Sequence, residues 1–304
     1  MAIGAKLSRF ELYRKLRIPI KEHIMDWDRK RYRKMNIFEA PEITNDAIET
    51  IEDLLTIDVD IKDHICHVKI NQTEYEKFEE ELGFQRQYDK KYSDRYRPKI
   101  LEYYLAKKLL DLDTHSGDSF FQYIDAASAN SPWALWLRKK YGISAYSVDL
   151  LESRAGEAYY IKGDVTDLPF IDHSIDAISM QSALETFPDR VDIDFIKDAG
   201  RVLRKGGLLL VTPLYLSTVY ANCFGKRYYG HLVPDEGAQK YIRFGYSGPT
   251  TRLYDVEHLK SRLLNTAVQS GLDYTILIFD MDSLMIDCWD KYMYSHFGLL
   301  CRKI

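Results

Sequence analysis

The feature that most constrains the fold is an alternation of short apolar runs with helical segments, which begins near Gly117. Apolar runs predict strands at 120–124, 144–148, 158–161, 175–180, 207–212, 274–279 and 297–302. Helical patterns fall between them at 131–141, 193–203 and 255–270. Strands that alternate with helices in this way indicate a largely parallel sheet covered by helices, so we predict an α/β fold.

The chain ahead of this alternation has a different pattern. Segments 45–55, 73–82 and 98–112 place apolar residues three and four positions apart, as amphipathic helices do. We therefore predict two parts: a helical N-terminal extension over residues 1–112 and the α/β domain over residues 113–304, with an insertion at about 215–254. The length of 304 residues is enough for one large domain with such an extension.

Three aspartates stand directly at or after the ends of predicted strands. Asp125 ends the first strand, Asp149 the second, and Asp164 follows the third. Ligands of open parallel sheets bind beyond the carboxyl ends of the strands, so these carboxylates are expected to converge on one crevice. Taken singly, each aspartate is explained as well by a turn or a cap.

Four landmarks carry a resemblance to a known family. They are Tyr123-Ile124-Asp125, Val148-Asp149-Leu150, the segment Gly163-Asp164-Val165-Thr166-Asp167-Leu168-Pro169-Phe170, and Arg201-Val202-Leu203-Arg204-Lys205-Gly206-Gly207. In order and spacing they resemble the class I S-adenosylmethionine (SAM)-dependent methyltransferases, of the kind called methyltransferase type 11. The resemblance implies a Rossmann-like seven-stranded sheet, SAM as the cofactor and a methyltransferase activity.

The resemblance also implies where the cofactor binds. Asp149 is expected to accept from the ribose hydroxyls, and Asp164 from the adenine amine beside the backbone N–H of Val165. Asp125 is expected to orient the first loop and to hold the amino-acid end of the cofactor. The other residues that the resemblance places against the cofactor are Ala127, Ala129, Leu150 and Gln181.

The first loop departs from the family pattern. The family has Asp-x-Gly-x-Gly-x-Gly, whereas Asp125 is followed here by Ala126-Ala127-Ser128-Ala129-Asn130-Ser131. A methyl group is tolerated if the loop avoids positive φ, and Asn130 can supply a left-handed residue where one is needed. The alternative is a loop that no longer admits SAM, which would leave a non-catalytic methyltransferase-like partner or scaffold.

The acceptor side is predicted from the segment after the fourth strand, Gln181-Ser182-Ala183-Leu184-Glu185-Thr186-Phe187. If the acceptor is a hydroxyl, a general base is needed. The candidates are Glu185 and, in the insertion, Tyr215, Tyr229 and His231, with His231 preferred for its ordinary pKa near 6.5. The insertion is rich in tyrosine and carries arginines, as in a lid over a sugar-like substrate. Aromatic core packing explains the same tyrosines equally well.

We therefore predict O-methylation of a small hydroxylated acceptor, a sugar or a metabolite of a polysaccharide pathway. Asp189, Asp192 and Asp194 are explained by capping at a helix start, and no residue is assigned to a metal. The acceptor, the acceptor atom and the oligomeric state stay open.

Charge and composition bear on partners and compartment. The net charge of −4 and the pI near 6.1 argue against a nucleic-acid partner. Residues 1–34 are basic, with 11 Lys+Arg against 4 Asp+Glu, and this segment is the one feature that favours a nucleic-acid methyltransferase. Because the rest of the chain is acidic, that function is the least favoured alternative. No uninterrupted apolar run reaches the 18 or so residues of a membrane span. Four scattered cysteines without a CxxC pair favour a cytoplasmic protein.

Overall fold

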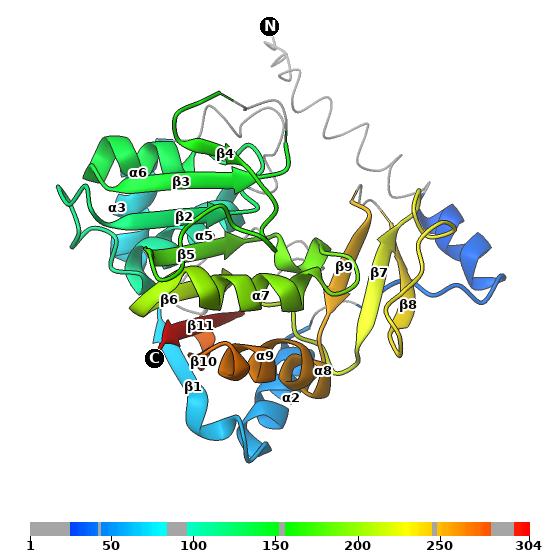
Figure 1. The fold of residues 1–304 in the computed structure, drawn as a ribbon. Coiled ribbons are helices and arrows are strands. Elements are labelled where there is room, and N and C mark those ends of the chain that lie inside the picture. The colour runs from blue at the N-terminus through cyan, green and yellow to red at the C-terminus, as the bar shows by residue number, and fades with distance from the viewer. Residues whose placement is uncertain (1–24, 42–43, 84–95, 152–155, 245–247, 281–294) are drawn as a thin grey trace, which may run out of the picture. The chain divides into compact units, whose positions relative to one another are not determined.

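The computed structural model describes residues 25–41, 44–83, 96–151, 156–244, 248–280 and 295–304 (Figure 1). The chain divides into two compact units. The first unit combines Met1–Pro41 with Ala221–Thr250, and the second combines Glu42–Tyr220 with Thr251–Ile304. Residues 112 and 113, between which the sequence predicts a domain boundary, both lie in the second unit.

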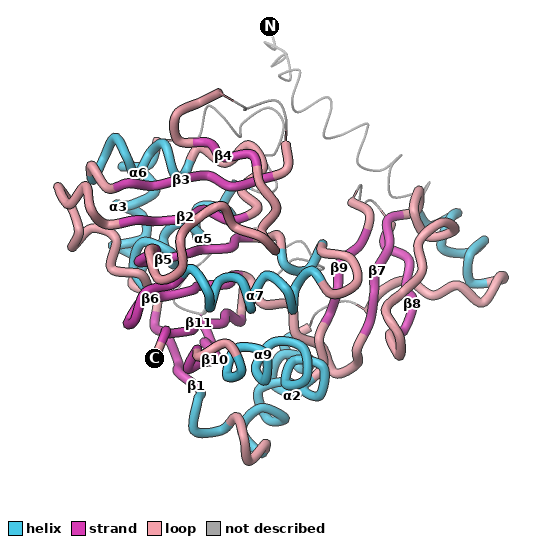
Figure 2. The backbone as a smooth tube through the Cα atoms, in the orientation of Figure 1, coloured by secondary structure: helices cyan, strands magenta, loops and turns pink. Residues whose placement is uncertain are grey.

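The second unit is built on an eight-stranded sheet (Figure 2). In spatial order its strands are β1 (Ile65–Lys69), β10 (Leu272–Asp280), β11 (Phe297–Lys303), β6 (Leu203–Thr212), β5 (Ile175–Gln181), β2 (Gln122–Ala126), β3 (Ser144–Asp149) and β4 (Tyr160–Lys162). β11 runs antiparallel to both of its neighbours, and all other adjacent strands are parallel. The predicted Rossmann-like α/β fold is confirmed.

The sheet contains one strand more than the seven expected. β1 comes from the N-terminal region that the sequence pattern predicts to be helical, and it pairs in parallel with β10, with Ile65 opposite Ile276. A strand of five residues at a sheet edge gives little periodicity of its own, so its place is decided by a partner about 210 residues away.

Helices cover both faces of this sheet. They are α2 (Asn45–Ile57), α3 (Gln72–Leu82), α5 (Tyr96–Leu109), α6 (Trp133–Tyr141), α7 (Val191–Val202), α8 (Val256–His258), a π-helical turn (Leu259–Leu264) and α9 (Asn265–Gln269). In Figure 1, α7 and α9 lie in front of the sheet, and α5 and α6 lie behind it. Every residue of β5 is buried, as expected for a central parallel strand covered on both faces.

Local sequence sets the helix boundaries. Thr44 caps α2 by accepting from Ala47 N at 3.2 Å, and Asn71 caps α3 by accepting from Glu74 N at 3.1 Å. Gly142 ends α6 in the left-handed conformation, at φ 70°. Gly200 of α7 is required by close packing, because a Cβ there would lie 2.7 Å from Cβ of Ser270.

An aromatic cluster joins α5 and α6 to the sheet. The rings of Tyr103 and Trp133 stack with centroids 4.9 Å apart, and Trp133 stacks on Trp136 at 5.2 Å. The indole N–H of Trp133 donates to the Tyr123 hydroxyl at 2.9 Å, so the polar atom of a fully buried ring is satisfied. This cluster fixes α5 and α6 behind β2, the strand that leads to the first loop.

The first unit joins the N-terminal segment to most of the insertion. β7 (Ala221–Gly225) and β8 (Gln239–Arg243) pair in parallel, with Cys223 opposite Tyr241. On β8, Ile242 donates to Phe38 O and accepts from Ala40 N, both at 2.9 Å. β9 (Thr250–Leu253) leads the chain back to the second unit.

Some predicted features fall outside the described residues, namely residues 1–24 of the basic segment, Tyr246 and Cys288. In the described part of the chain, no helix has the length and apolar character needed to cross a bilayer.

Candidate active site

The carboxyl ends of four parallel strands meet at one edge of the sheet. β2 ends at Ala126, directly after Asp125, and β3 ends at Asp149. β5 ends at Gln181 and β6 at Thr212, which lie opposite each other in the register. The strand-end residues singled out in the sequence are therefore brought to the edge at which open α/β sheets bind ligands.

Asp149 connects β3 to the first loop. One carboxylate oxygen accepts from the backbone N–H of Ala129 at 2.8 Å, and the other accepts from that of Leu151 at 3.0 Å. The side chain is half-buried, and a carboxylate offers about four lone-pair sites, so two backbone donors leave acceptor capacity. Asp149 thus both shapes the loop and retains the capacity to accept from a diol.

The first loop does not have the conformation expected from its composition. Ala127 and Ala129 have φ of 50° and 48°, whereas Asn130 is not among the described residues with positive φ. The condition under which we expected the methyl groups to be tolerated without strain, a loop that avoids positive φ, is therefore not met. The two alanines stand where the family pattern has its first two glycines, so the backbone here adopts, at residues with a Cβ, a conformation that glycine reaches readily.

The donor and acceptor groups at this edge suit SAM. The hydroxyls of Ser128 in the first loop and Thr212 at the end of β6 are buried and have no hydrogen-bond partner among the described residues. Asp164 is exposed, and its Oδ1 accepts from Thr166 N at 2.9 Å and from Thr166 Oγ1 at 2.8 Å. Acceptors for ribose hydroxyls and an adenine amine are thus present on the residues predicted to supply them.

Asp125 and the neighbouring residues differ in exposure. Asp125 is only 1% exposed, and its carboxylate adds to the effect of burial in raising the pKa of Tyr123 well above its usual value. Val165 is buried, whereas Leu150 is 67% exposed. Asp125 therefore lies inside the sheet, beside Tyr123, whereas Leu150 lies at the surface.

The end of β5 is fixed by a group that the sequence analysis missed. Glu102 on α5, 1% exposed, accepts from Lys99 Nζ and from Ser182 Oγ, each at 2.6 Å. Lys99 also donates to the carbonyl of Gln181 at 3.2 Å. The available signal was a Lys and a Glu three residues apart in a helix whose other residues are mostly apolar. Ser182, at φ 51°, is thus held in a left-handed conformation directly after β5.

The predicted acceptor-side residues lie in different places. The side-chain amide of Gln181 donates to Ser179 Oγ at 3.0 Å and so turns into the sheet. Glu185, in a 3₁₀ turn at Leu184–Thr186, is 6% exposed, and Tyr215 is 2% exposed. His231 is an exposed residue of the first unit, in a turn where its N–H donates to Tyr228 O at 2.9 Å. The second unit thus carries Glu185 and Tyr215 together with the three aspartates.

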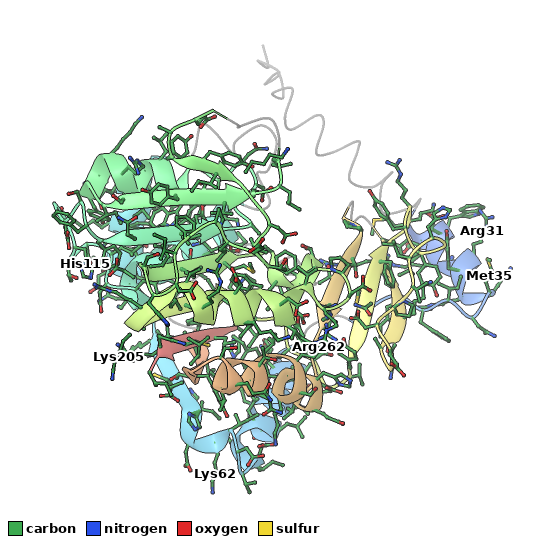
Figure 3. All side chains as sticks on the ribbon, viewed as in Figure 1. Arg31, Met35, Lys62, His115, Lys205 and Arg262 are labelled. Carbon is green, nitrogen blue, oxygen red and sulfur yellow. The ribbon has the colours of Figure 1, made fainter. Side chains whose placement is uncertain are left out.

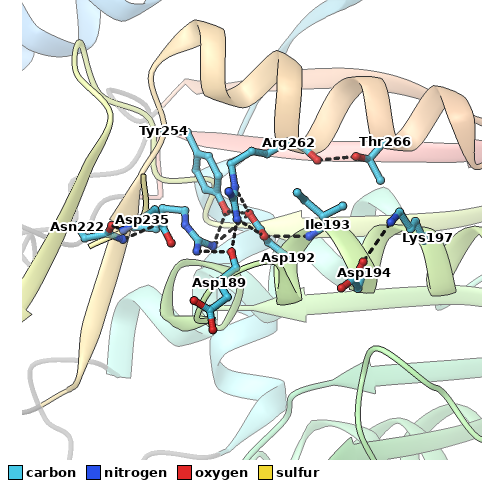
Figure 4. A network of polar contacts seen from close by, with 11 residues as sticks. Asp189, Asp192, Ile193, Asp194, Lys197, Asn222, Asp235, Tyr254, Arg262 and Thr266 are labelled. Carbon is cyan, nitrogen blue, oxygen red and sulfur yellow. Dashed lines mark hydrogen bonds and ion pairs between the residues drawn. The ribbon is translucent and has the colours of Figure 1, made fainter. Parts of the chain in front are cut away.

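Asp192 at the start of α7 belongs to a buried ionic network (Figure 4). Its carboxylate accepts from Arg262 at 2.7 Å and 2.9 Å, from the Tyr254 hydroxyl at 2.7 Å and from Arg252 at 3.1 Å. Both arginines also donate to the carbonyl of Asp189. Burial raises the pKa of Tyr254 well above its usual value, and the Asp192 carboxylate raises it further. These contacts assign Asp192 a structural role in an ion-pair network.

Comparison with known proteins agrees with this geometry. Residues 125–211 match the family model of a methyltransferase domain. Over 131 residues the chain is 28% identical to the demethylmenaquinone methyltransferase of Thermotoga maritima, a match that covers 40% of this chain and 50% of that protein. The chain thus spans about half the length of this curated relative.

Two solved structures are also similar to the chain. A Burkholderia thailandensis 1,6-didemethyltoxoflavin-N1-methyltransferase has a TM-score of 0.43 at 12% identity, covering 77% of this chain and 91% of that one. A geranyl diphosphate C-methyltransferase from Streptomyces coelicolor has a TM-score of 0.42 at 14% identity, covering 67% and 81%. Residues 125–211 thus match a methyltransferase domain, and the strand order and the strand-end aspartates agree with the class I SAM-dependent methyltransferases that the sequence landmarks resemble.

Proposed function

We propose that this protein is a cytoplasmic SAM-dependent methyltransferase that O-methylates a small hydroxylated acceptor, a sugar or a metabolite of a polysaccharide pathway. The observation that carries the proposal is the connection of Asp149 to the first loop through Ala129 N. It lies within the segment that matches the methyltransferase family. The free cysteines Cys66, Cys223 and Cys301 are consistent with a reducing compartment.

SAM, when bound, supplies a methyl group on a positively charged sulfur that is open to in-line displacement. The residues of this chain bind and align. Asp149 would accept from the ribose hydroxyls, Asp164 would accept from the adenine amine beside Val165, and Asp125 would hold the loop next to the amino-acid end. Alignment of the acceptor with the methyl group accounts for most of the rate, because the reaction needs little covalent assistance from the protein.

A hydroxyl acceptor must also lose its proton. We propose Glu185 as the base, because its carboxylate lies four residues beyond the end of β5, in the unit that carries the three aspartates. Tyr215 and His231 remain the alternatives, and His231 belongs to the other unit. General base catalysis contributes roughly 10²–10⁴-fold to a rate. If Glu185 is the base, Glu185→Gln is expected to retain its affinity for SAM and to lose at least about tenfold in kcat.

The test of the proposal is calorimetric titration with SAM, followed by release of S-adenosylhomocysteine in the presence of sugars and sugar nucleotides. Asp149→Asn is expected to weaken SAM binding by about ten- to a hundredfold, since hydrogen bonds to charged groups contribute roughly 1.5–3 kcal/mol. Asp118→Asn is the matched control, because Asp118 also accepts a backbone N–H, from Phe120 at 2.9 Å, ahead of β2.

The second candidate is a non-catalytic methyltransferase-like scaffold, which the alanines of the first loop favour. It predicts no heat of SAM binding at millimolar cofactor for the wild type and for both variants. Binding that is lost equally in Asp118→Asn and Asp149→Asn would also contradict the proposed site.

A further inference from the structure

The first unit exposes three large apolar side chains within a short stretch of chain. Trp27, Met35 and Phe38 are 61%, 59% and 58% exposed. Single exposed apolar residues are common on soluble proteins, whereas a group of large ones indicates an interaction surface. Something other than water is expected to cover this group.

The same stretch carries four exposed cations, Lys30, Arg31, Arg33 and Lys34. None of them forms an ion pair with the residues that the structure describes. Their neighbour Arg29 differs, because it pairs with Asp26 at 2.9 Å and with Glu39 at 2.6 Å. The positive charge of the four is therefore uncompensated within the described chain.

Helix geometry places Trp27 beside two of the cations. Residues 25–33 are helical, so Trp27, Lys30 and Arg31, at spacings of three and four, share one face. The Arg31 guanidinium lies 5.7 Å from the Trp27 ring centroid. Figure 3 shows Arg31 and Met35 on the outer side of this segment.

The opposite face of the helix is anchored in its own unit. Asp28, 5% exposed, accepts from Lys226 at 2.5 Å, and the Tyr32 ring packs edge-on against Phe244 with centroids 5.5 Å apart. The exposed face is thus held outward by the packing of the inward one.

We propose that this basic-aromatic surface, formed by Trp27, Lys30, Arg31, Arg33, Lys34, Met35 and Phe38, docks on an anionic membrane. Trp and Phe insert at the boundary of headgroups and acyl chains, while Lys and Arg attract the lipid phosphates. The chain has no surplus of positive charge overall, at −4, so the attraction is local. Three bulky apolar groups among the cations favour a lipid layer, which accepts them, over a nucleic-acid backbone.

The test is vesicle flotation with the full-length protein and two lipid mixtures, pure phosphatidylcholine and phosphatidylcholine with 30% phosphatidylglycerol as the probe. The wild type is expected to float with the anionic vesicles only, and less so as salt is raised. Each cation near the surface contributes about fivefold to binding, so Lys30→Gln/Arg31→Gln/Lys34→Gln should weaken it by roughly a hundredfold. Trp27→Ala should weaken it by about tenfold.

The matched control is Lys62→Gln/Lys205→Gln, which neutralises two exposed lysines of the second unit. This control should float within about twofold of the wild type. Thermal unfolding and SAM titration of every variant verify the fold and keep this proposal separate from the proposed activity.

A wild type that ignores anionic vesicles overturns the proposal, and so does a control that loses as much as the triple variant. Salt-sensitive binding to a single-stranded RNA without flotation would assign the surface to nucleic acid instead.

Discussion

At the scale of single residues, the first loop is the place where conformation and residue type disagree. Left-handed backbone at a residue with a Cβ costs roughly 1–2 kcal/mol, and Ala127 and Ala129 both adopt it. Hydrogen bonding of Ala129 N to Asp149 helps to hold the loop in this conformation. The loop thus holds two alanines in a backbone conformation that glycine would reach without this cost.

Ala127→Gly is expected to leave the protein as stable as the wild type or to stabilise it by up to about 1 kcal/mol, because relief of the left-handed strain outweighs the added freedom of the unfolded chain. Ala126→Gly is the control, since Ala126 is a buried residue of β2 that does not have a positive φ. This change should destabilise the protein by roughly 1 kcal/mol. Urea unfolding measures both. Equal destabilisation by the two changes would refute the assigned loop strain.

Residue-scale prediction from sequence succeeded where a residue's position in a strand determines its place. Asp149 could be assigned to the sheet edge because it ends an apolar run. The conformation of Ala127 could not, because local propensity disfavours positive φ and the surrounding contacts override it. Glu102 was missed because its partner Ser182 lies 80 residues away.

At the scale of elements, Glu102 and Lys99 connect α5 to the end of β5 by hydrogen bonds to Ser182 and Gln181. Truncating Glu102 leaves the part-buried Lys99 ammonium and the Ser182 hydroxyl without their shared carboxylate, so Glu102→Ala should destabilise by about 1–3 kcal/mol. Removing the partner as well, in Glu102→Ala/Lys99→Met, should cost less than the sum of the single changes by at least about 1 kcal/mol. Additive effects in a double-mutant cycle of urea unfolding would show that the pair is not coupled.

The ionic network connects the start of α7 to the π-helical turn through Asp192 and Arg262. Asp192→Ala should therefore destabilise by about 3–5 kcal/mol, because the buried Arg252 and the partly buried Arg262 lose their carboxylate. Asp194→Ala, two residues along the same helix, removes only an exposed pair with Lys197 and should cost less than about 1 kcal/mol. If the two variants have the same melting temperature, this network does not stabilise the protein.

Element boundaries followed the sequence closely where the periodicity was long. The helix predicted at 255–270 is present, although a π-helical turn interrupts it at Leu259–Leu264. β6 starts at Leu203, earlier than predicted, because Leu203, Arg204 and Lys205 extend the strand before Gly207. Such details depend on the neighbouring strand, which a local pattern does not include.

At the scale of the whole molecule, the insertion and the N-terminal segment form one compact unit. Ala40 and Ile242 are hydrogen-bonded although about 200 residues separate them. No local pattern predicts this association, whereas the parallel sheet of the second unit follows from alternating elements. Most of the predicted lid and the whole of His231 thus lie in the first unit. The sequence pattern does not predict that this unit is distinct from the α/β domain.

Stability is expected to fall in alkaline solution. Burial raises the pKa of the Cys301 thiol from its ordinary value near 9 to about 12. The folded state therefore holds this proton more tightly, so the stabilisation is complete below pH 9 and is lost as the pH rises toward 12. The loss is about 1.4 kcal/mol per pH unit for each such thiol.

Urea unfolding at pH 8, 9 and 10 checks this expectation. Cys301→Ala should flatten the dependence of the free energy of unfolding on pH. Identical slopes for the wild type and Cys301→Ala would contradict the assignment to Cys301.

The most direct test of the central claim is an experimental structure of the protein with S-adenosylhomocysteine. The account predicts a nucleoside at the carboxyl edge of the sheet, with its ribose hydroxyls on Asp149 and its adenine amine on Asp164. A crevice that stays empty at millimolar ligand, or a nucleoside that contacts neither aspartate, would contradict it.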